Sequence, residues 1–257
     1  MSIFVLGDPH LSFSSDKPMD IFGRNWKNHP KKIKKAWNRR VRPQDTVVLA
    51  GDISWAMSLK EAEKDLDFLH SLPGRKVLLK GNHDYWWETA SKMRTFFKER
   101  GWDDIVLLHN NFVVADGVAL CGTRGWDITA GGEQDLKMQE REYQRLEHSL
   151  RCVPKGMKRI VFFHYPPVDE KNEPYLPLLK KYKVRRCYYG HVHGIKAKET
   201  KKIRRKGITF TLVSADALDF KPRRILKKRG KKDFSHQNCQ KNPSFWGKLL
   251  SNFKSKC

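Results

Sequence analysis

Five short apolar runs, each followed at once by Asp, Asn or His side chains, constrain the fold of this chain more than any other feature. The runs cover residues 3–6, 46–50, 76–80, 159–163 and 186–189. Their length and their content of Val, Ile, Leu and Phe predict strands that are buried on both faces. Stretches with helical patterns separate several of the runs, and this alternation is typical of a parallel α/β sheet. We therefore expect the polar groups at the carboxyl ends of the strands, where α/β proteins place their sites.

The polar groups that follow the strands have the chemistry of a ligand set. They are Asp8, His10, Asp52, Asn82, His83, His164, His191 and His193. Carboxylate and imidazole together suit Mn²⁺, Fe²⁺ or Zn²⁺, whereas an oxygen-only set would suit Mg²⁺ or Ca²⁺. The set is larger than one tetrahedral ion needs, which favours two divalent ions with one shared ligand. Asp52 stands alone on its loop and is the natural bridging group. Taken alone, the run from Gly81 to Asp84 is equally consistent with a polar turn.

Other patterns predict the elements around these strands. Residues 18–42 have intermittent helical spacing that Pro30 interrupts. Ser58 and Glu61 have the spacing of a capping box, for a helix that runs to Pro73-Gly74. Residues 112–115 and 118–121 flank Asp116-Gly117 and predict an antiparallel hairpin. Residues 133–151 predict a long charged helix, for which a peripheral position is favoured over a lid above the site.

Composition restricts the partners and the compartment. The net charge of +24 and the pI near 9.9 indicate an anionic partner, either nucleic acid or an acidic membrane surface. The five cysteines lack CxxC spacing, so the sequence indicates neither a zinc knuckle nor a disulfide framework. We find no apolar run long enough to be a transmembrane segment and no cationic leader before the first strand. A cytoplasmic location is the resulting expectation.

A change in composition after Pro222 predicts a second region. Lys and Arg crowd the chain from Arg223 to Lys232. We expect a catalytic-type domain over residues 1–226 and a basic tail over residues 227–257. The tail has the charge to bind nucleic acid, but a solvated, disordered tail is an equally good interpretation. Near its end, a helix would gather Phe245, Trp246, Leu249, Leu250 and Phe253 into an apolar face bordered by lysines. Docking of this face on the domain is simpler than docking on an anionic membrane.

Taken in order, the polar blocks resemble those of the calcineurin-like metallophosphoesterase superfamily, which read DxH, GD, GNH(D/E), H and GHxH. Here they are Asp8-Pro9-His10, Gly51-Asp52, Gly81-Asn82-His83-Asp84, His164 and Gly190-His191-Val192-His193, and the resemblance spans about residues 1–226. It implies a four-layer α/β/β/α sandwich of two mixed sheets flanked by helices, with two metal ions. Carried over, Asp8, His10, Asp52 and His193 would hold one ion. Asp52, Asn82, His164 and His191 would hold the other, and His83 would be the uncoordinated catalytic histidine.

The resemblance and the chemistry together predict a metal-dependent phosphohydrolase. The second block continues as Ile53-Ser54-Trp55-Ala56 and lacks the GDxVDRG extension of Ser/Thr protein phosphatases, which favours the phosphodiesterase-like branches. Two ions would hold a bridging hydroxide that attacks a phosphate ester, such as that of a nucleotide or nucleic acid, and His83 would assist the leaving group. The competing hypothesis is a non-catalytic scaffold that binds nucleic acid or protein.

Two residues after the predicted hairpin are candidates for substrate binding. Arg124 has the planar fork to hold a phosphate group, and Trp126 has a ring on which a base could stack. A structural arginine and a core tryptophan are equally good interpretations.

Overall fold

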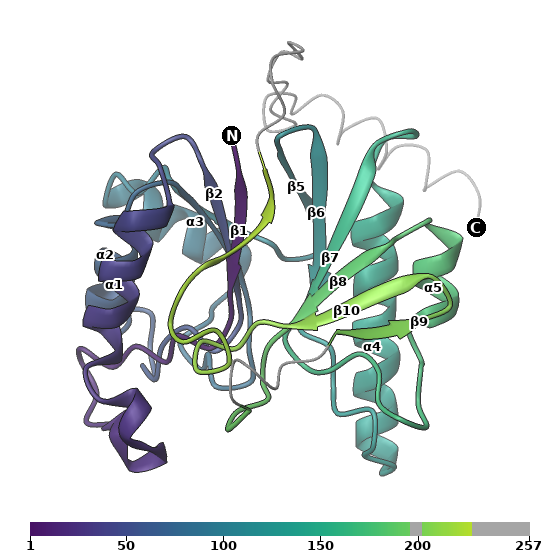
Figure 1. Ribbon diagram of the computed structural model, residues 1–257, viewed down its shortest axis with the longest axis horizontal. Helices are drawn as coiled ribbons and strands as arrows, with labels where there is room; N and C mark the ends of the chain where they lie inside the picture. Colours follow the sequence, from purple (N-terminus) through teal and green to yellow (C-terminus); the bar gives the residue numbers. More distant parts are fainter. Residues whose placement is uncertain (196–201, 228–257) are drawn as a thin grey trace.

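Two β-sheets packed face to face form the centre of the molecule, and helices cover both outer faces (Figure 1). The computed structural model describes residues 1–195 and 202–227. The first sheet has five strands in the order β11-β1-β2-β3-β4, and the second has six in the order β5-β6-β7-β8-β10-β9. This is the four-layer α/β/β/α sandwich that the sequence predicts.

The first sheet is parallel except at one edge. Its parallel strands are β1 (Ile3–Leu6), β2 (Thr46–Ala50), β3 (Arg75–Leu79) and β4 (Ile105–Leu107). Strand β11 (Arg223–Leu226) pairs antiparallel with β1. Because the parallel strands run in one direction, the loops after β1, β2 and β3 leave the sheet at the same end.

The second sheet is also mixed. Its parallel strands are β6 (Val118–Thr123), β7 (Lys158–Phe163), β8 (Arg186–Tyr189) and β10 (Ile208–Leu212). Strands β5 (Phe112–Ala115) and β9 (Ile203–Arg205) pair antiparallel at the two edges. The predicted hairpin of β5 and β6 is confirmed: Asp116 and Gly117 have φ angles of 48° and 71°, as a type I′ turn requires.

Helices α1 (His29–Arg40), α2 (Glu63–His70) and α3 (Ala90–Glu99) cover the outer face of the first sheet (Figure 1). Helices α4 (Glu133–Arg151) and α5 (Leu176–Lys181) cover that of the second. The 3₁₀ helices η1 (Met19–Phe22) and η2 (Arg24–Trp26) precede α1. Leu146 and Leu150 of α4 are buried against the second sheet, so α4 has the peripheral position that the sequence favours.

The burial pattern of single strands explains the layers. Along β1, Phe4 and Leu6 join the core beneath α1 to α3, whereas Ile3 and Val5 join the core between the sheets. Side chains of a strand alternate between the two faces, so a strand with both faces buried carries apolar residues at every position. A third core lies between the second sheet and helices α4 and α5. Three apolar cores thus hold four layers together.

Three local predictions are wrong in detail. Pro30 occupies the first turn of α1 and begins that helix, because proline lacks the N–H that the first turn leaves unpaired. The amide of Glu61 donates to Ser58 Oγ as in a capping box, but the Glu61 carboxylate accepts the amide of Met57, and these bonds close a turn ahead of α2, which begins at Glu63. Arg223 and Arg224 are placed in strand β11 by their pairing with β1 and do not begin a tail.

The predicted tail falls almost wholly outside the described residues. Lys227 is described, whereas residues 228–257 are not. They include the rest of the basic run, up to Lys232, and the apolar segment from Phe245 to Phe253. The boundary after Leu226 therefore stays a prediction, as does the cytoplasmic location. Among the described residues, no helix combines the length and the apolar character needed to cross a membrane.

Candidate metal centre

The structure brings all eight predicted site residues to the same end of the two sheets. Asp8 and His10 follow β1, Asp52 follows β2, and Asn82 and His83 follow β3 in the first sheet. His164 follows β7, and His191 and His193 follow β8 in the second. The centre therefore lies where loops of both sheets meet, and neither sheet alone supplies a complete ligand set.

One group of possible ligands consists of Asp8, His10 and His193. Each offers an atom within 4.8 Å of the atoms offered by the others. The Nε2 atoms of His10 and His193 lie 3.2 Å apart. Two nitrogens that each lie about 2.0–2.1 Å from a shared ion have a separation of this order. Asp8 is fully buried, and both its oxygens accept the backbone N–H of His191, at 2.9 and 3.0 Å.

A second group consists of Asp52, His164 and His191, again with ligand atoms within 4.8 Å of one another. The side-chain oxygen of Asn82 joins it, 2.5 Å from His164 Nε2 and 3.0 Å from His191 Nδ1. His164 Nδ1 lies 3.2 Å from the carbonyl oxygen of Ala50, which fixes the ring orientation and leaves Nε2 facing the group.

The carboxylate of Asp52 lies between the two groups. Its Oδ2 is 3.8 Å from His10 Nε2, and its Oδ1 is 3.4 Å from His164 Nε2. One oxygen therefore faces each group, which is the arrangement that a bridging ligand requires. An imidazole ring cannot bridge two neighbouring ions in this way, because only one of its nitrogens can face the pair.

Two glycines are required by the close approach of these loops. A Cβ at Gly190 would stand 2.5 Å from Asp8 Oδ2, and one at Gly81 would overlap the backbone and carboxylate of Asp52. Several candidate ligands also have left-handed backbones, an unusual conformation for residues other than glycine that concentrates at functional sites. Their φ angles are 52° at Asp8, 44° at His10, 49° at Asp52 and 68° at His191.

Burial makes the carboxylates of this centre hard to ionise without a counter-charge. It raises the pKa of Asp8 to about 7, although His193 and the amide of His191 act in the opposite direction. Burial, together with the charges of Asp8 and Asp84, raises the pKa of Asp52 to about 9. Burial also holds the pKa of His10 and of His164 well below the usual range, so both rings are neutral. Neutral imidazoles and crowded carboxylates are the donor set that divalent cations fit.

These pKa shifts predict how the stability of the metal-free protein depends on pH. Between pH 7 and pH 9 the folded state still holds a proton on Asp52 that the unfolded chain has already released, whereas Asp8 gives up its extra proton around pH 7, so stability falls as the pH rises. We expect the Tm of EDTA-treated protein to decrease across this window, and to decrease less with Mn²⁺ present. A metal-free Tm that is constant or rises from pH 7 to pH 9 would contradict the shifts.

His83 lies beside the two groups without joining either. Its backbone N–H donates to Asp52 Oδ1 at 2.8 Å, and its ring packs against Trp55 at a centroid distance of 4.5 Å. Its Nδ1 is buried and has no hydrogen-bond partner within the described part of the chain. Burial, and then the charges of His193 and Lys17, lower the pKa of His83. A lowered pKa makes the protonated ring a stronger acid.

Asp84 holds the loop that carries Asn82 and His83. Its carboxylate is fully buried and accepts hydrogen bonds from the amides of Gly81, Ile53 and Ser54 and from the indole of Trp86. Asp84 therefore orients this loop through hydrogen bonds from backbone amides. Because Ile53 and Ser54 directly follow Asp52, this one carboxylate ties together the loops after β2 and β3.

Asp216 is a functional candidate that the sequence analysis missed. Its Oδ1 lies 3.1 Å from His193 Nδ1, and its Oδ2 accepts the amide of Gly194 at 2.8 Å. Burial tends to lower the pKa of His193, but the bond to Asp216 and the charge of Asp8 raise it by more. Asp216 follows β10, so the pattern of a polar residue after an apolar run, which marked the other ligands, was present here too.

Replacing Asp216 is expected to weaken metal binding. Carboxylates that fix a ligating histidine typically contribute 10–100-fold to metal affinity, so we expect a loss of about that size in Asp216→Ala. Mn²⁺ titration by calorimetry measures it, and Asp219→Ala, at an exposed position in the same segment, is the control. Equal Mn²⁺ affinity in the Asp216→Ala and Asp219→Ala proteins would exclude this supporting role.

The two candidate substrate residues lie next to the centre. The carbonyl oxygen of Arg124 accepts the amides of His164 and Tyr165, at 3.1 and 2.9 Å. Its guanidinium lies over the ring of Trp126, at 4.7 Å from the centroid. The indole N–H of Trp126 donates to Asp135 at 2.9 Å, so the ring is held in place on two sides. Binding of substrate by Arg124 and Trp126 stays a prediction.

The fold and the two groups of Asp and His side chains support a metal-dependent phosphoesterase. The family model for calcineurin-like phosphoesterases matches residues 1–194, and the chain belongs to this family. The match includes every predicted ligand and His83. A comparison with curated proteins gave no match.

Solved structures with low sequence identity share the fold. Phosphopantetheinyl hydrolase (PptH) from Mycobacterium tuberculosis is 14% identical, with a TM-score of 0.56, over 91% of this chain and 98% of that chain. Protein TT1561 of Thermus thermophilus is 13% identical, with a TM-score of 0.50, over 87% of this chain and 97% of that chain. At these identities the likeness concerns the fold alone.

Proposed function

We propose that this protein is a phosphodiesterase with a dinuclear metal centre. The observation that carries the proposal is the position of Asp52, whose two oxygens face two separate groups of ligands, with His10 in one and His164 in the other. Asp8, His10, Asp52 and His193 would hold one ion. Asp52, Asn82, His164 and His191 would hold the other.

Divalent ions at these positions would supply positive charge to phosphoryl oxygens and acidify a water molecule. The chain contributes the rest of the site. Asp84 holds the loops after β2 and β3 in register, and Trp55 stacks on His10 with ring centroids 4.9 Å apart. The stacked indole covers one side of His10 and also packs on His83, which keeps both rings in fixed orientations.

His83 is the group that we assign to proton transfer. A departing alkoxide needs a proton, and a histidine within hydrogen-bond reach supplies it most efficiently when its pKa lies near the working pH. The His83 amide is bonded to Asp52, so the ring is anchored directly beside the proposed bridging ligand. The buried, unpaired Nδ1 and the lowered pKa are consistent with a ring kept free for this task.

A phosphodiester substrate is favoured over a phosphoprotein by the second block. The residues after Asp52 are Ile53, Ser54 and Trp55, and the amides of Ile53 and Ser54 are both bonded to Asp84. The segment therefore helps to hold the loop in place through these amides. It lacks the arginine and second aspartate that the protein phosphatase branch carries there.

The proposal is tested with nitrophenyl phosphate esters. Protein treated with EDTA and then supplied with Mn²⁺, Fe²⁺ or Zn²⁺ is expected to hydrolyse bis(4-nitrophenyl) phosphate with a higher kcat/KM than 4-nitrophenyl phosphate. The same protein without added metal is the control. A higher kcat/KM for the monoester would show that the protein is a phosphomonoesterase and not a phosphodiesterase. Absence of turnover with every metal, at full metal content, would favour the non-catalytic scaffold.

A further inference from the structure

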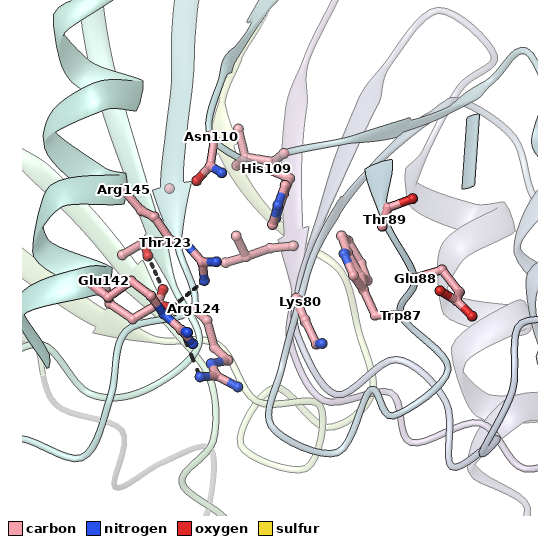
Figure 2. Close-up of a pocket in the computed structure, with 14 residues that line it drawn as sticks. Lys80, Trp87, Glu88, Thr89, His109, Asn110, Thr123, Arg124, Glu142 and Arg145 are labelled. Carbon is pink, nitrogen blue, oxygen red and sulfur yellow. Dashed lines mark hydrogen bonds and ion pairs between the residues drawn. The ribbon is translucent and has the colours of Figure 1, made fainter. Parts of the chain in front are cut away.

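A cavity with an excess of positive charge lies beside the metal centre. It has a volume of about 390 Å³ and is bordered by the ends of β3 and β4 in one sheet and by β6 and α4 in the other. Lys80 and Trp87 stand on one side, and Arg124, Glu142 and Arg145 stand on the other (Figure 2). Its size is within the range of small-molecule sites.

The charges that line the cavity do not balance. Lys80, Arg124, Arg141 and Arg145 line the cavity with two carboxylates, Glu142 and Glu88, of which Glu88 is paired with Lys92, so at least two positive charges stay unmatched. Glu142 is bonded to Arg145 at 2.6 Å and lies 4.0 Å from Arg124. Within residues 1–195 and 202–227, neither Lys80 nor Arg141 takes part in an ion pair.

Two buried donors on the cavity wall are also unused. Neither Arg124 Nε nor Trp87 Nε1 has a hydrogen-bond partner among the described residues. Leaving such groups unpaired away from water costs free energy, and buried donors are therefore normally bonded. A guanidinium N–H and an indole N–H both donate well to the oxygens of an anion. Residues that line the cavity thus supply both the positive charge and the unpaired donors.

Residues that line the cavity are close in sequence to the loops of the metal centre. Lys80 directly precedes Gly81 of the loop that carries Asn82 and His83, and Trp87 follows the same loop. On the other side, the carbonyl oxygen of Arg124 accepts the amides of His164 and Tyr165. Segments next to the loops that carry His83 and His164 therefore also border the cavity.

We propose that this cavity binds a second phosphate group of the substrate. The substrate class is then a small phosphodiester that carries a terminal phosphate besides the one that is cleaved. A terminal phosphate has a charge of about −1.5 to −2 near neutral pH, which matches the two unmatched positive charges. This inference rests on the proposed phosphodiesterase function, and it adds the identity of a substrate group.

A matched pair of esters tests the proposal by activity. One ester is the 4-nitrophenyl ester of thymidine 5′-phosphate, and the other is the same compound with an additional 3′-phosphate. Wild-type protein is expected to prefer the second. In Lys80→Met, which keeps most of the side-chain volume, the ratio of the two kcat/KM values should fall about tenfold or more, since a charged hydrogen bond is lost. Arg141→Ala should also lower this ratio of kcat/KM values.

The control variant is Arg151→Ala, which removes one exposed positive charge from the far end of α4. Its ratio of kcat/KM values should equal that of the wild type. Equal kcat/KM values for the two esters in the wild-type protein, or a ratio in Lys80→Met equal to that in Arg151→Ala, would overturn the proposal.

A binding experiment separates this proposal from the proposed function. Metal-free wild-type, Lys80→Met and Arg151→Ala proteins are titrated with inorganic pyrophosphate by calorimetry. The cavity predicts about tenfold weaker binding in Lys80→Met than in the other two. If neither ester is hydrolysed but pyrophosphate affinity depends on Lys80, the proposed function fails and the anion site stands. If the esters are hydrolysed and pyrophosphate binds all three proteins equally, the anion site fails alone.

Discussion

Replacement of His83 by alanine is expected to lower kcat by about 10²–10⁴-fold while both metal ions stay bound. The His83 ring lies outside both groups of ligands, so its loss removes no metal contact. Its backbone N–H, which donates to Asp52, is unchanged by the substitution. Metal content by mass spectrometry and kcat by steady-state assay measure the two effects separately.

The leaving group shows whether His83 acts by proton transfer. An alkyl ester leaves as a strongly basic alkoxide and needs a proton, whereas nitrophenolate leaves without one. We therefore expect a large loss of kcat for an alkyl phosphodiester in His83→Ala and a much smaller loss for the nitrophenyl diester. His148→Ala, on the peripheral helix α4, is the control. Equal losses for both esters would assign His83 a structural part, and wild-type turnover at full metal content would remove it from the mechanism.

Replacement of Asp52 by asparagine is expected to remove metal binding and activity together. The substitution takes away the charge that faces both ligand groups, so we expect activity at micromolar metal to fall at least about 10³-fold. Asparagine keeps an oxygen that can accept the amide of His83, which limits other changes. The measurements are metal content after dialysis and kcat/KM over a range of Mn²⁺ concentrations.

The same variant separates function from stability. Burial and the charges of Asp8 and Asp84 raise the pKa of Asp52, so near neutral pH the metal-free fold must take up a proton on Asp52 that the unfolded chain has released, which lowers its stability. Metal-free Asp52→Asn protein should therefore unfold at a Tm equal to or above that of the metal-free wild type, while the rise in Tm on adding Mn²⁺ is lost. A large Mn²⁺-dependent rise in Tm in this variant would show that Asp52 is not a ligand of either ion.

Local patterns predict the buried strands and the convergence of the loops, whereas the four layers are implied by the resemblance to the family. Strands β1 and β2 are buried on two faces and are therefore apolar at nearly every position, which the sequence shows directly. The sequence also shows glycine at positions 81 and 190, where the loops approach so closely that no side chain fits. The order of the polar blocks, through the resemblance to the family, then predicts the ligands without any knowledge of distances.

The remaining features depend on contacts between distant segments. Strand β11 carries Arg223 and Arg224, which resemble a basic tail until the pairing with β1 places them in a sheet. The bond between Asp216 and His193 joins residues on different loops, and the cavity around Lys80 needs both sheets and α4. Tertiary packing decides all three: the sequence shows Asp216 after an apolar run, but it does not show the bond to His193, the pairing of β11 or the cavity.

The account depends most on two ions sharing Asp52, and diffraction from Mn²⁺-soaked crystals tests this most directly. The anomalous map is predicted to show two peaks about 3.5–4 Å apart, the usual spacing of such pairs, with one oxygen of Asp52 beside each. A single peak, or two peaks of which only one contacts Asp52, would contradict the dinuclear centre.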